Sequence, residues 1–417
     1  MDRRRFLKVA AASMPLLAGR AAGQAKPHVV IVGGGYGGAT AARYLKLWAP
    51  AIEVTLVERE AAFVSCPLSN LVIGGHAAIQ DVTRSYATVA KLGVRVIADT
   101  ATAVDPSRRT LKLARGPELA YDRLIVSPGV DFLFSAMPHY EAAARAGQVL
   151  HAWKAGAETV ALRRQLEAMR DGGVYVLSIP LAPYRCPPGP YERACQVASY
   201  FKKTKPRSKV LVLDANEDIT SKAALFRKAW AELYPGLIEY RPNSVAVDID
   251  GPSSTVKLEL DDVKGDVLNV IPPHRAARIA ADTGLITHNQ RWCNVDWRSM
   301  ESTAVPGIHV LGDATLSAPA MAKAGHMANQ QGKVCAAAII ELLAGRPPEP
   351  RPVFASTCYS FVSGTEAIHV ASVHQWNDKE KSVTIVPGSN GVSAARSEQE
   401  GIYAWSWARN IWADMLG

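Results

Sequence analysis

Apolar runs of strand length alternate with segments of helical periodicity along most of the chain. The runs that predict strands lie at residues 28–32, 53–57, 93–97, 109–113, 121–126, 174–179, 209–214 and 304–311. Segments with helical character lie at residues 39–45, 160–170, 191–203 and 324–343. Strands that alternate with helices in this way are typical of βαβ units. The pattern therefore predicts an α/β fold.

The first βαβ unit carries a glycine-rich turn. The strand at 28–32 leads into a G-x-G-x-x-G motif formed by Gly33, Gly35 and Gly38. In this motif the first glycine makes a tight turn, the second lets a pyrophosphate approach the backbone, and the third lets helix and strand pack closely. The next strand ends on Glu58, whose carboxylate can accept hydrogen bonds from ribose hydroxyls. The unit is therefore predicted to bind a dinucleotide.

A second unit, at residues 172–214, has the same order of elements but lacks the glycines. Its first strand leads instead into a loop in which Cys186 stands among four prolines. Proline adds bulk and has no backbone N–H, so this loop is unsuited to cradling a phosphate. Asp214 stands where a nicotinamide-ribose acid would stand, but without the glycine turn it is only a relic of the topology. The unit is predicted to be a Rossmann-like domain that lacks a nicotinamide site.

The C-terminal third is predicted to complete the first domain. The strand at 304–311 ends in Gly312-Asp313, and a helix follows at 324–343. In two-dinucleotide flavoproteins this aspartate accepts from the ribityl chain; the alternative is a plain cap or turn aspartate. We predict two Rossmann-like (two-dinucleotide-binding) domains and a small C-terminal module. The boundaries are 26–138 and 280–345 for the two halves of an FAD-binding domain, 139–279 for the second domain, and 346–417 for the module.

The cysteines restrict the possible chemistry. They stand at positions 66, 186, 195, 293, 335 and 358, and no two have C-x-x-C spacing. A structural zinc site, a ferredoxin-type cluster and covalently bound c-type haem therefore lack support. No metal site is predicted, and haem, where it takes part, belongs to a partner chain. Cys195, Cys293 and Cys335 are interpreted as packing residues.

Cys66 lies in a Val-Ser-Cys-Pro loop just after the ribose-binding strand. In flavoproteins of this fold that loop runs beside the isoalloxazine ring. A cysteine there could attach to the 8α-methyl group of the flavin as a thioether. The alternative is that Cys66 serves only as a small, buried apolar side chain.

Cys186 and Cys358 are a second pair of interest. Cys186 precedes a helix that begins near Pro190, where the helix dipole and free backbone donors are expected to lower a thiol pKa. A disulfide between Cys186 and Cys358 would accept the two electrons of a nucleophile and pass them inward, whereas a purely structural disulfide is the alternative. Glu192, in the first helical turn, either shuttles protons for that exchange or only stabilises the helix N-terminus.

The N-terminus and the charge bear on location and partners. Residues 3–8 read Arg-Arg-Arg-Phe-Leu-Lys, the twin-arginine export pattern, and the apolar stretch after them is too short for a lasting anchor. Residues 1–25 are interpreted as a signal peptide for export to the periplasm. The net charge of +9 includes no basic block with interleaved aromatics, so no nucleic-acid partner is predicted. No later apolar run reaches about 18 residues, so no transmembrane helix is expected.

Together these motifs resemble one family. They comprise the glycine turn, Cys66 in Val-Ser-Cys-Pro, Cys186 in Tyr-Arg-Cys-Pro-Pro-Gly-Pro-Tyr-Glu-Arg, the segment 271–276, Gly312-Asp313 and Cys358 in Cys-Tyr-Ser. Over nearly its whole length the chain is similar to the flavoprotein subunit of flavocytochrome c sulfide dehydrogenase. The resemblance implies 8α-S-cysteinyl FAD on Cys66 and a redox-active Cys186–Cys358 disulfide that hydrosulfide attacks. It also implies a heterodimer in which FAD passes electrons to a c-type cytochrome subunit. Glu192 falls on a family acid beside the disulfide.

Two other functions stay open. Sulfide:quinone reductases share the cysteine pair, but they typically carry a third flavin-adjacent cysteine where this chain has none between residues 67 and 185. A membrane-associated enzyme of that kind needs a docking surface, and Tyr403, Trp407, Ile411 and Met415 form one helical stripe. Such a stripe more often packs on the protein's own core or covers the flavin. The remaining alternative is a non-catalytic accessory flavoprotein of a sulfur-oxidation pathway.

Overall fold

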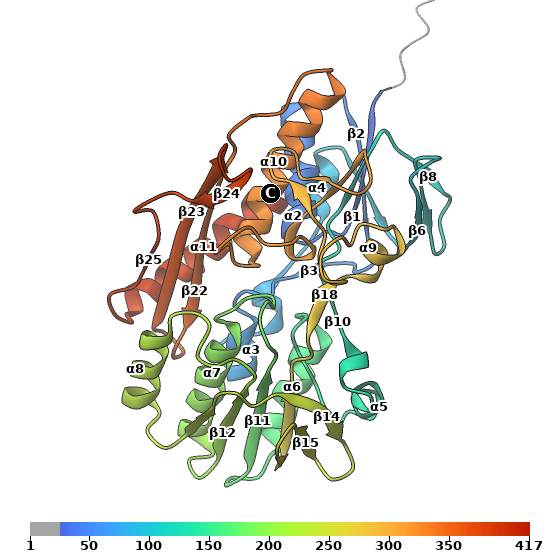
Figure 1. Ribbon diagram of the computed structural model, residues 1–417. Coiled ribbons are helices and arrows are strands. Elements are labelled where there is room, and N and C mark those ends of the chain that lie inside the picture. Colours follow the sequence, from blue (N-terminus) through green and yellow to red (C-terminus); the bar gives the residue numbers. More distant parts are fainter. Residues whose placement is uncertain (1–25) are drawn as a thin grey trace, which may run out of the picture.

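The computed structural model describes residues 26–417, and its largest sheet is assembled from two distant parts of the chain (Figure 1). The strand order is β19–β20–β21–β9–β1–β2–β5. The strands are β1 (His28–Val32), β2 (Glu53–Glu58), β5 (Val94–Ala98), β9 (Arg123–Val126), β19 (Val295–Asp296), β20 (Glu301–Ser302) and β21 (Ile308–Val310). β21 pairs in parallel with β9, so the C-terminal third extends the sheet that the N-terminal third begins. The twin-arginine signal predicted at residues 1–25 lies outside the described residues.

Helices α2 (Tyr36–Trp48) and α10 (Gly325–Leu343) pack against each other beside this sheet. Small residues make their close approach possible, because a Cβ built on Gly332 would stand 2.5 Å from the carbonyl oxygen of Gly37. Shorter helices in this unit are α3 (Ser69–Gly74), α4 (Ala87–Lys91) and α9 (Arg278–Asp282). Small strands flank the unit: β3 (Phe63–Val64), β4 (Thr83–Arg84), β6 (Ala101–Asp105), β7 (Thr110–Leu113) and β8 (Leu119–Ala120).

A second parallel sheet, in the order β13–β12–β11–β17, forms the other large unit. Its strands are β11 (Val174–Ile179), β12 (Lys209–Asp214), β13 (Ile238–Arg241) and β17 (Val267–Val270). The helices of this unit are α5 (Tyr140–Arg145), α6 (Ala157–Ala168), α7 (Gly189–Thr204) and α8 (Ala223–Leu233). A small antiparallel sheet adds β14 (Ala246–Asp250), β15 (Thr255–Leu258) and β16 (Asp262–Lys264). One mainly parallel sheet and one parallel sheet, each with covering helices, confirm the predicted α/β class.

Two short antiparallel strands connect the two units. β10 (Val130–Phe132) leads out of the first unit, and β18 (His274–Ala276) leads back into it. In Figure 1 they lie between the upper and the lower sheet.

The C-terminal module is an antiparallel sheet followed by one long helix. The elements are β22 (Val353–Phe361), β23 (Ala367–Asn377), β24 (Ser382–Ile385), β25 (Gly391–Val392) and α11 (Glu398–Leu416). β22 contacts α10 of the first unit and α7 of the second, so the module packs against both. On the predicted stripe of α11, Ile411 and Met415 are buried and Trp407 is partly buried, whereas Tyr403 is 50% exposed. The stripe therefore packs mostly on the protein's own core.

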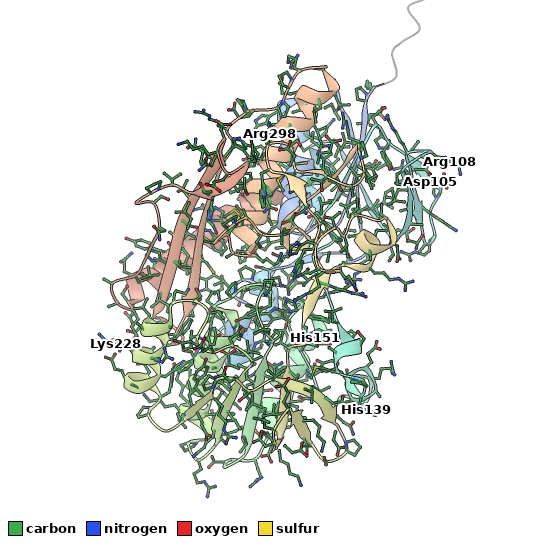
Figure 2. The ribbon with its side chains drawn as sticks, in the orientation of Figure 1. Asp105, Arg108, His139, His151, Lys228 and Arg298 are labelled. Carbon is green, nitrogen blue, oxygen red and sulfur yellow. The ribbon has the colours of Figure 1, made fainter. Side chains whose placement is uncertain are left out.

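Charged side chains fall into two classes, which Figure 2 illustrates. Arg108, Lys228 and Arg298 lie at the periphery, and their side chains are 70%, 61% and 43% exposed. Ion pairs at such exposed positions contribute little to stability. His151, in contrast, lies in the interior with a side chain only 13% exposed. Titratable side chains therefore occur in the interior as well as at the surface.

Within residues 26–417, no helix combines the length and the apolar character needed to cross a bilayer. The same residues contain no cluster of three or more histidine, cysteine, aspartate or glutamate side chains suited to hold a metal ion.

The packing of α11 on the β22–β23 turn generates a prediction. A Cβ on Gly401 would stand 1.9 Å from the carbonyl oxygen of Thr365, so Gly401→Ala must push the helix away from the turn. We expect a loss of about 1–3 kcal/mol in stability, measured as a lower midpoint of thermal unfolding. Gly391→Ala is the control, because its Cβ would meet nothing within 4 Å. Equal midpoints for the two variants would contradict this packing.

Candidate active site

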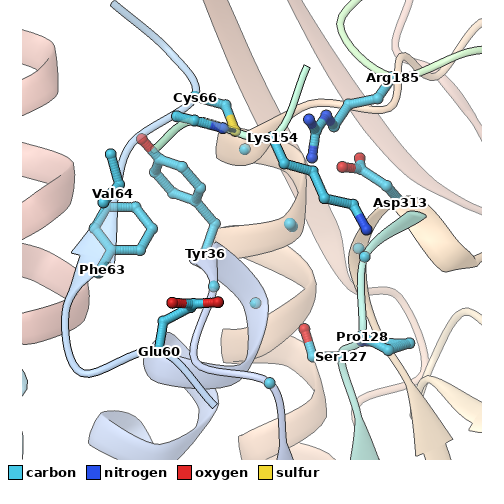
Figure 3. A pocket seen from close by; sticks show the side chains of 18 of the residues that line it. Tyr36, Glu60, Phe63, Val64, Cys66, Ser127, Pro128, Lys154, Arg185 and Asp313 are labelled. Carbon is cyan, nitrogen blue, oxygen red and sulfur yellow. Dashed lines mark hydrogen bonds between the residues drawn. The ribbon is translucent and has the colours of Figure 1, made fainter. Parts of the chain in front are cut away.

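A cavity of about 1000 Å³ is lined by residues of both parallel units and of the C-terminal module. Figure 3 shows part of it, with Phe63 and Val64 on one side and Arg185 and Asp313 on the other. The predicted site residues that line it are Gly33, Gly35, Glu58, Cys66, Cys186, Glu192, Gly312, Asp313 and Cys358. Gly38 does not line the cavity. The fold therefore brings nearly all of the predicted residues around one space.

The three glycines of the motif have different local roles. Gly33 has φ +95°, and a Cβ on it would stand 2.2 Å from the carbonyl oxygen of Ser127. A Cβ on Gly38 would stand 1.9 Å from the carbonyl oxygen of Gly33, which explains why this residue packs the helix and does not line the cavity. A Cβ on Gly35 would meet no protein atom within 4 Å, so the space beside it is open. This geometry fits the close approach of a pyrophosphate.

Two carboxylates fit the hydroxyls of a bound dinucleotide. Glu58 is fixed at the end of β2, where its Oε2 accepts from the backbone N–H of Gly34 at 2.6 Å. Asp313 lines the cavity, and its Oδ1 is buried without a hydrogen-bond partner in the described residues. Burial raises the pKa of Asp313, although Arg185 and Lys323 oppose the shift. A buried acceptor without a donor is costly, so a ligand hydroxyl at Asp313 fits the site.

The N-terminus of α10 lies at the same cavity. Gly325 and His326, the first residues of the helix, are among the lining residues. The first turn of a helix has free N–H groups and a partial positive charge. His326 also joins this wall to the C-terminal module, because its Nδ1 accepts from the backbone N–H of Thr357 at 3.0 Å.

Cys66 lies on the loop between β3 and α3 and faces a second loop across the cavity wall. Its Sγ accepts from the backbone N–H of Ala155 at 3.4 Å and lies 3.9 Å from the carbonyl oxygen of Trp153. The preceding Ser65 holds the loop by hydrogen bonds to Tyr36 and to the carbonyl of Pro67, both 2.7 Å long. The thiol is partly exposed and lines the cavity, so a bound cofactor could reach it.

Cys186 and Cys358 meet although 172 residues separate them in the sequence. Cys186 lies in the loop before α7 with φ +57°, and its backbone N–H donates to the carbonyl of Lys323 at 2.8 Å. Cys358 lies on β22, opposite Val370 of β23. Both cysteines are free thiols in the structure, and they hydrogen-bond to each other. The geometry therefore allows thiol–disulfide chemistry between the second unit and the C-terminal module.

The pKa values of the two thiols differ from the sequence-based expectation. The hydrogen bond to Cys358, followed by burial, raises the pKa of Cys186. The hydrogen bond from Cys186 and the nearby charge of Lys222 lower the pKa of Cys358 to about 7, against burial and Glu192. The expectation that the start of α7 lowers the pKa of Cys186 is therefore wrong. The physical reason is that two adjacent sulfurs share one proton, and the charge of Lys222 favours the thiolate on Cys358.

Glu192 is buried between three elements. Its Oε2 accepts from the Nδ2 of Asn70 on α3 at 2.9 Å, and its Oε1 accepts from the backbone N–H of Phe361 on β22 at 2.8 Å. Burial raises the pKa of this carboxyl, and the two hydrogen bonds oppose the shift. A buried acid with a raised pKa next to two free thiols can hold or release a proton at the site.

Arg193, the next residue of α7, is 1% exposed and anchors the surrounding loops. Its donors reach the Oδ1 of Asn70 at 3.0 Å, the carbonyl of His151 at 2.8 Å, the Oδ1 of Asn269 at 2.9 Å and the carbonyl of Ala152 at 2.7 Å. The guanidinium is thus satisfied mainly by neutral acceptors.

In the second unit, the acid that stands at the position of a nicotinamide-ribose acid is Asp214. Asp214 is fully buried, and its Oδ2 accepts from the hydroxyls of Tyr191 at 2.7 Å and Tyr240 at 2.9 Å. Its Oδ1 accepts from the backbone and side chain of Asn216. The carboxylate that would bind a ribose is therefore occupied by hydrogen bonds within the protein.

Sequence reasoning missed several residues of the site. Asn70, Trp153, Arg193 and Lys222 surround the cysteines or their loops, and only Arg193 belongs to a recognisable motif, as the last residue of the Cys186 segment. Asn70 and Arg193 stand close in sequence to Cys66 and Glu192, and this proximity is the one signal that could have found them. Lys222 carries no local signal, because its partners lie on β22, far along the chain.

Family models match three successive segments of the chain. Residues 27–165 match the pyridine nucleotide-disulphide oxidoreductase model. Residues 159–272 match the central domain of the sulfide dehydrogenase (flavocytochrome c) flavoprotein chain. Residues 350–416 match the flavocytochrome c sulphide dehydrogenase flavin-binding model. A flavin-binding model over the module that carries Cys358 supports FAD as the dinucleotide of the cavity.

Individual relatives agree with these models. The sulfide dehydrogenase (flavocytochrome c) flavoprotein chain of Chlorobaculum thiosulfatiphilum is 61% identical over 45 residues, which are 11% of this chain and 94% of that sequence. The mitochondrial sulfide:quinone oxidoreductase of Mus musculus is 25% identical over 337 residues, which are 74% of this chain and 70% of that protein.

Among solved structures, the sulfide:quinone oxidoreductase of Aquifex aeolicus superposes with a TM-score of 0.76, at 17% identity, over 93% of this chain and 91% of that one. A NAD-dependent persulfide reductase of A. fulgidus gives a TM-score of 0.64, at 18% identity, over 92% and 77% of the two chains. At such identities the similarity concerns the fold alone. The family models and the sequence relatives show that the chain is a flavoprotein related to flavocytochrome c sulfide dehydrogenase and sulfide:quinone reductase.

Proposed function

We propose that this chain is the sulfide-oxidising subunit of a flavocytochrome c sulfide dehydrogenase and that its electron acceptor is a c-type cytochrome subunit. The observation that carries the proposal is the contact between Cys186 and Cys358 on the wall of the cavity that the Gly33–Gly38 turn opens. A redox disulfide at this position adjoins the space that suits FAD. The match of two segments to flavocytochrome c sulfide dehydrogenase models favours the cytochrome-linked enzyme.

The chain's own residues supply a substrate site. In the oxidised state, the Cys186–Cys358 disulfide is the electrophile that hydrosulfide attacks. Glu192, buried beside the pair, holds or delivers the proton that accompanies the exchange. The wall formed by Trp153 and by Gly189 of α7 restricts the space at Cys186, because a Cβ on Gly189 would stand 2.9 Å from its sulfur. FAD supplies the two-electron acceptor when it is bound.

Cys66 is proposed as the covalent attachment point of FAD, through its sulfur and the 8α-methyl group. The support is the position of the partly exposed thiol on the cavity wall, held by backbone contacts from the Trp153–Ala155 loop. A covalent bond prevents loss of the cofactor from an exported enzyme. Export to the periplasm by the twin-arginine route is part of the proposal and rests on residues 3–8. Haem c is assigned to the partner subunit of the heterodimer.

A quinone is the second candidate acceptor, because the chain also resembles the mouse sulfide:quinone oxidoreductase over most of its length. The packing of the α11 stripe on the protein's own core leaves that stripe unsuited to membrane docking. The cytochrome is therefore the acceptor that we propose.

Reduced nicotinamides are expected not to reduce the flavin. The loop around Cys186 lacks a phosphate cradle, and Asp214 already accepts from two tyrosines. Anaerobic mixing of the purified protein with NADH or NADPH should leave the flavin absorbance unchanged, whereas dithionite should bleach it. Rapid, stoichiometric bleaching by either nicotinamide would show that a functional nicotinamide site exists.

Covalent attachment predicts that the flavin stays with the polypeptide after acid precipitation. Cys66→Ser should release it, because an oxygen at this position does not reproduce the thioether. The absorbance of pellet and supernatant at the flavin band measures the outcome, and Cys335→Ala serves as a control that changes a buried cysteine elsewhere. A colourless pellet from the unmodified protein would refute the linkage.

The cysteine pair is tested by Cys186→Ser and Cys358→Ser. Each variant should keep FAD that dithionite reduces, but should lose sulfide-dependent reduction of a c-type cytochrome, because hydrosulfide has no disulfide to attack. A merely structural bridge would instead lower stability by roughly 2–5 kcal/mol while the folded fraction kept its turnover. Activity is measured per mole of bound flavin, with Cys293→Ala as the control.

The same assay decides the acceptor when a soluble quinone replaces the cytochrome. Turnover with the cytochrome and not with the quinone supports the proposal. The reverse result would assign the chain to the quinone-linked branch. Near-parental activity of either serine variant would reject the catalytic role of the pair.

A further inference from the structure

Lys222 is a buried cation beside the cysteine pair. The residue is 8% exposed and stands at the N-terminal end of α8. Its ammonium donates to the carbonyl oxygen of Cys358 at 3.1 Å and to the Oγ of Ser360 at 2.8 Å. Both acceptors lie on β22, so the side chain crosses from the second unit to the strand that carries one of the two reactive sulfurs.

The backbone at Lys222 is held in an unusual conformation. Its φ of +56° and ψ of 35° place it in the left-handed region, which non-glycine residues adopt at a cost. Lysine is rarely buried to this extent, because removing its charge from water is expensive unless partners compensate. Here the partners are neutral oxygens, and burial lowers the pKa of Lys222. The conformation and the burial together aim a cation at the Cys358 segment.

The charges around the pair are distributed unequally between the two sulfurs. Three groups act on Cys358: Lys222 at the start of α8, Cys186 in the loop before α7, and Glu192 on α7. The charges that act on Cys186 are those of Cys358 and Glu192, which raise its pKa, and that of Arg185, which lowers it. Cys358 is the group whose charge acts most strongly on Lys222, followed by Glu192, Cys186 and Glu400.

We propose that Lys222 is a positioning residue that fixes the polarity of the cysteine pair, so that Cys358 carries the thiolate and Cys186 receives the sulfur of the substrate. This inference rests on the proposed function and deepens it, since it assigns different tasks to the two cysteines. This role also explains why the Lys222 ammonium is buried although its burial and its left-handed backbone conformation are both unfavourable.

The proposed reaction is an exchange between hydrosulfide and the Cys186–Cys358 disulfide. The sulfur of hydrosulfide forms a bond to the Sγ of Cys186, and the bond between Cys186 and Cys358 breaks. The electron pair of the broken bond remains on Cys358 as a thiolate, while Cys186 becomes a persulfide that keeps the proton of hydrosulfide. In disulfide exchange the thiol of lower pKa leaves faster. In the dithiol the hydrogen bond from Cys186 and then the charge of Lys222 lower the pKa of Cys358. Once Cys186 is a persulfide its thiol is gone, and the charge of Lys222 is what favours Cys358 as the leaving sulfur.

The first experiment measures the thiolate directly. In purified holoprotein carrying Cys186→Ser, the rate of iodoacetamide alkylation of Cys358 is followed against pH by peptide mass spectrometry. Serine keeps a hydrogen-bond donor beside Cys358, so the added effect of Lys222 is isolated. Adding Lys222→Met should move the midpoint upward by about one pH unit or more, because a nearby cation is lost.

Three further variants control this measurement. Lys222→Arg should retain most of the low midpoint, because the charge is kept. Lys228→Met on the same helix should leave the midpoint unchanged, since Lys228 lies at the periphery (Figure 2) and its side chain is 61% exposed. Glu192→Gln should move the midpoint downward, because the negative charge that opposes the thiolate is removed. Because Lys222→Arg and Glu192→Gln keep a polar side chain, they provide a test even where Lys222→Met fails to fold.

The second experiment locates the incoming sulfur. The oxidised protein with both cysteines is mixed with one equivalent of sulfide without oxygen, alkylated at once and mapped for the persulfide. The persulfide is expected on Cys186 in the parent and in part on Cys358 when Lys222 is replaced by methionine.

The proposal is overturned by a persulfide on Cys358 in the parent, or by an alkylation midpoint that neither Lys222→Met nor Glu192→Gln changes. The alkylation experiment uses no sulfide and no acceptor. A failure of the proposed function would therefore appear as absent turnover with the titration intact, and the two failures can be told apart.

Discussion

The site depends on the burial of a carboxylate at the junction of three elements. Glu192 accepts one hydrogen bond from Asn70 on α3 and one from the backbone of Phe361 on β22. A buried carboxyl group without donors would cost several kcal/mol, so these contacts require α3, α7 and β22 to meet in one arrangement. That arrangement places Cys358 of β22 against Cys186 of the loop before α7. The C-terminal module is thereby tied to the second unit at the point where the chemistry is proposed.

The loop that follows the first strand differs between the two Rossmann-like units. In the first, Gly33 makes the tight turn and Gly35 leaves open space beside the backbone, where a phosphate group fits. In the second, prolines fill the corresponding loop, and Asp214 is occupied by Tyr191 and Tyr240. A thiol and a buried acid stand where phosphate recognition would be expected. The same topology thus suits a cofactor in one unit and presents the proposed redox pair in the other.

Charge burial distinguishes this cavity from the rest of the molecule. Surface ion pairs such as that of Lys228 are exposed and contribute little. Lys222, Glu192 and Arg193 are almost completely buried, and each is hydrogen-bonded to neutral backbone, amide or hydroxyl groups. Such groups are expensive to place in a protein interior, which is why their presence around two cysteines points to function and not to stability.

The sequence by itself determined the parts that local patterns encode. Apolar runs and glycine spacing predicted the parallel strands, the turn at Gly33–Gly38 and the Gly312-Asp313 end of β21, because these features need only near neighbours in the chain. The resemblance to a known family supplied the pairing of Cys186 with Cys358. The long antiparallel strands of the C-terminal module were not predicted, because β22 alternates too weakly between buried and exposed positions. The tertiary structure alone decided which thiol has the lower pKa and which cation stands beside it. Lys222 reaches its partners across 136 and 138 residues of sequence, and an electrostatic field depends on distances in space that no local pattern records.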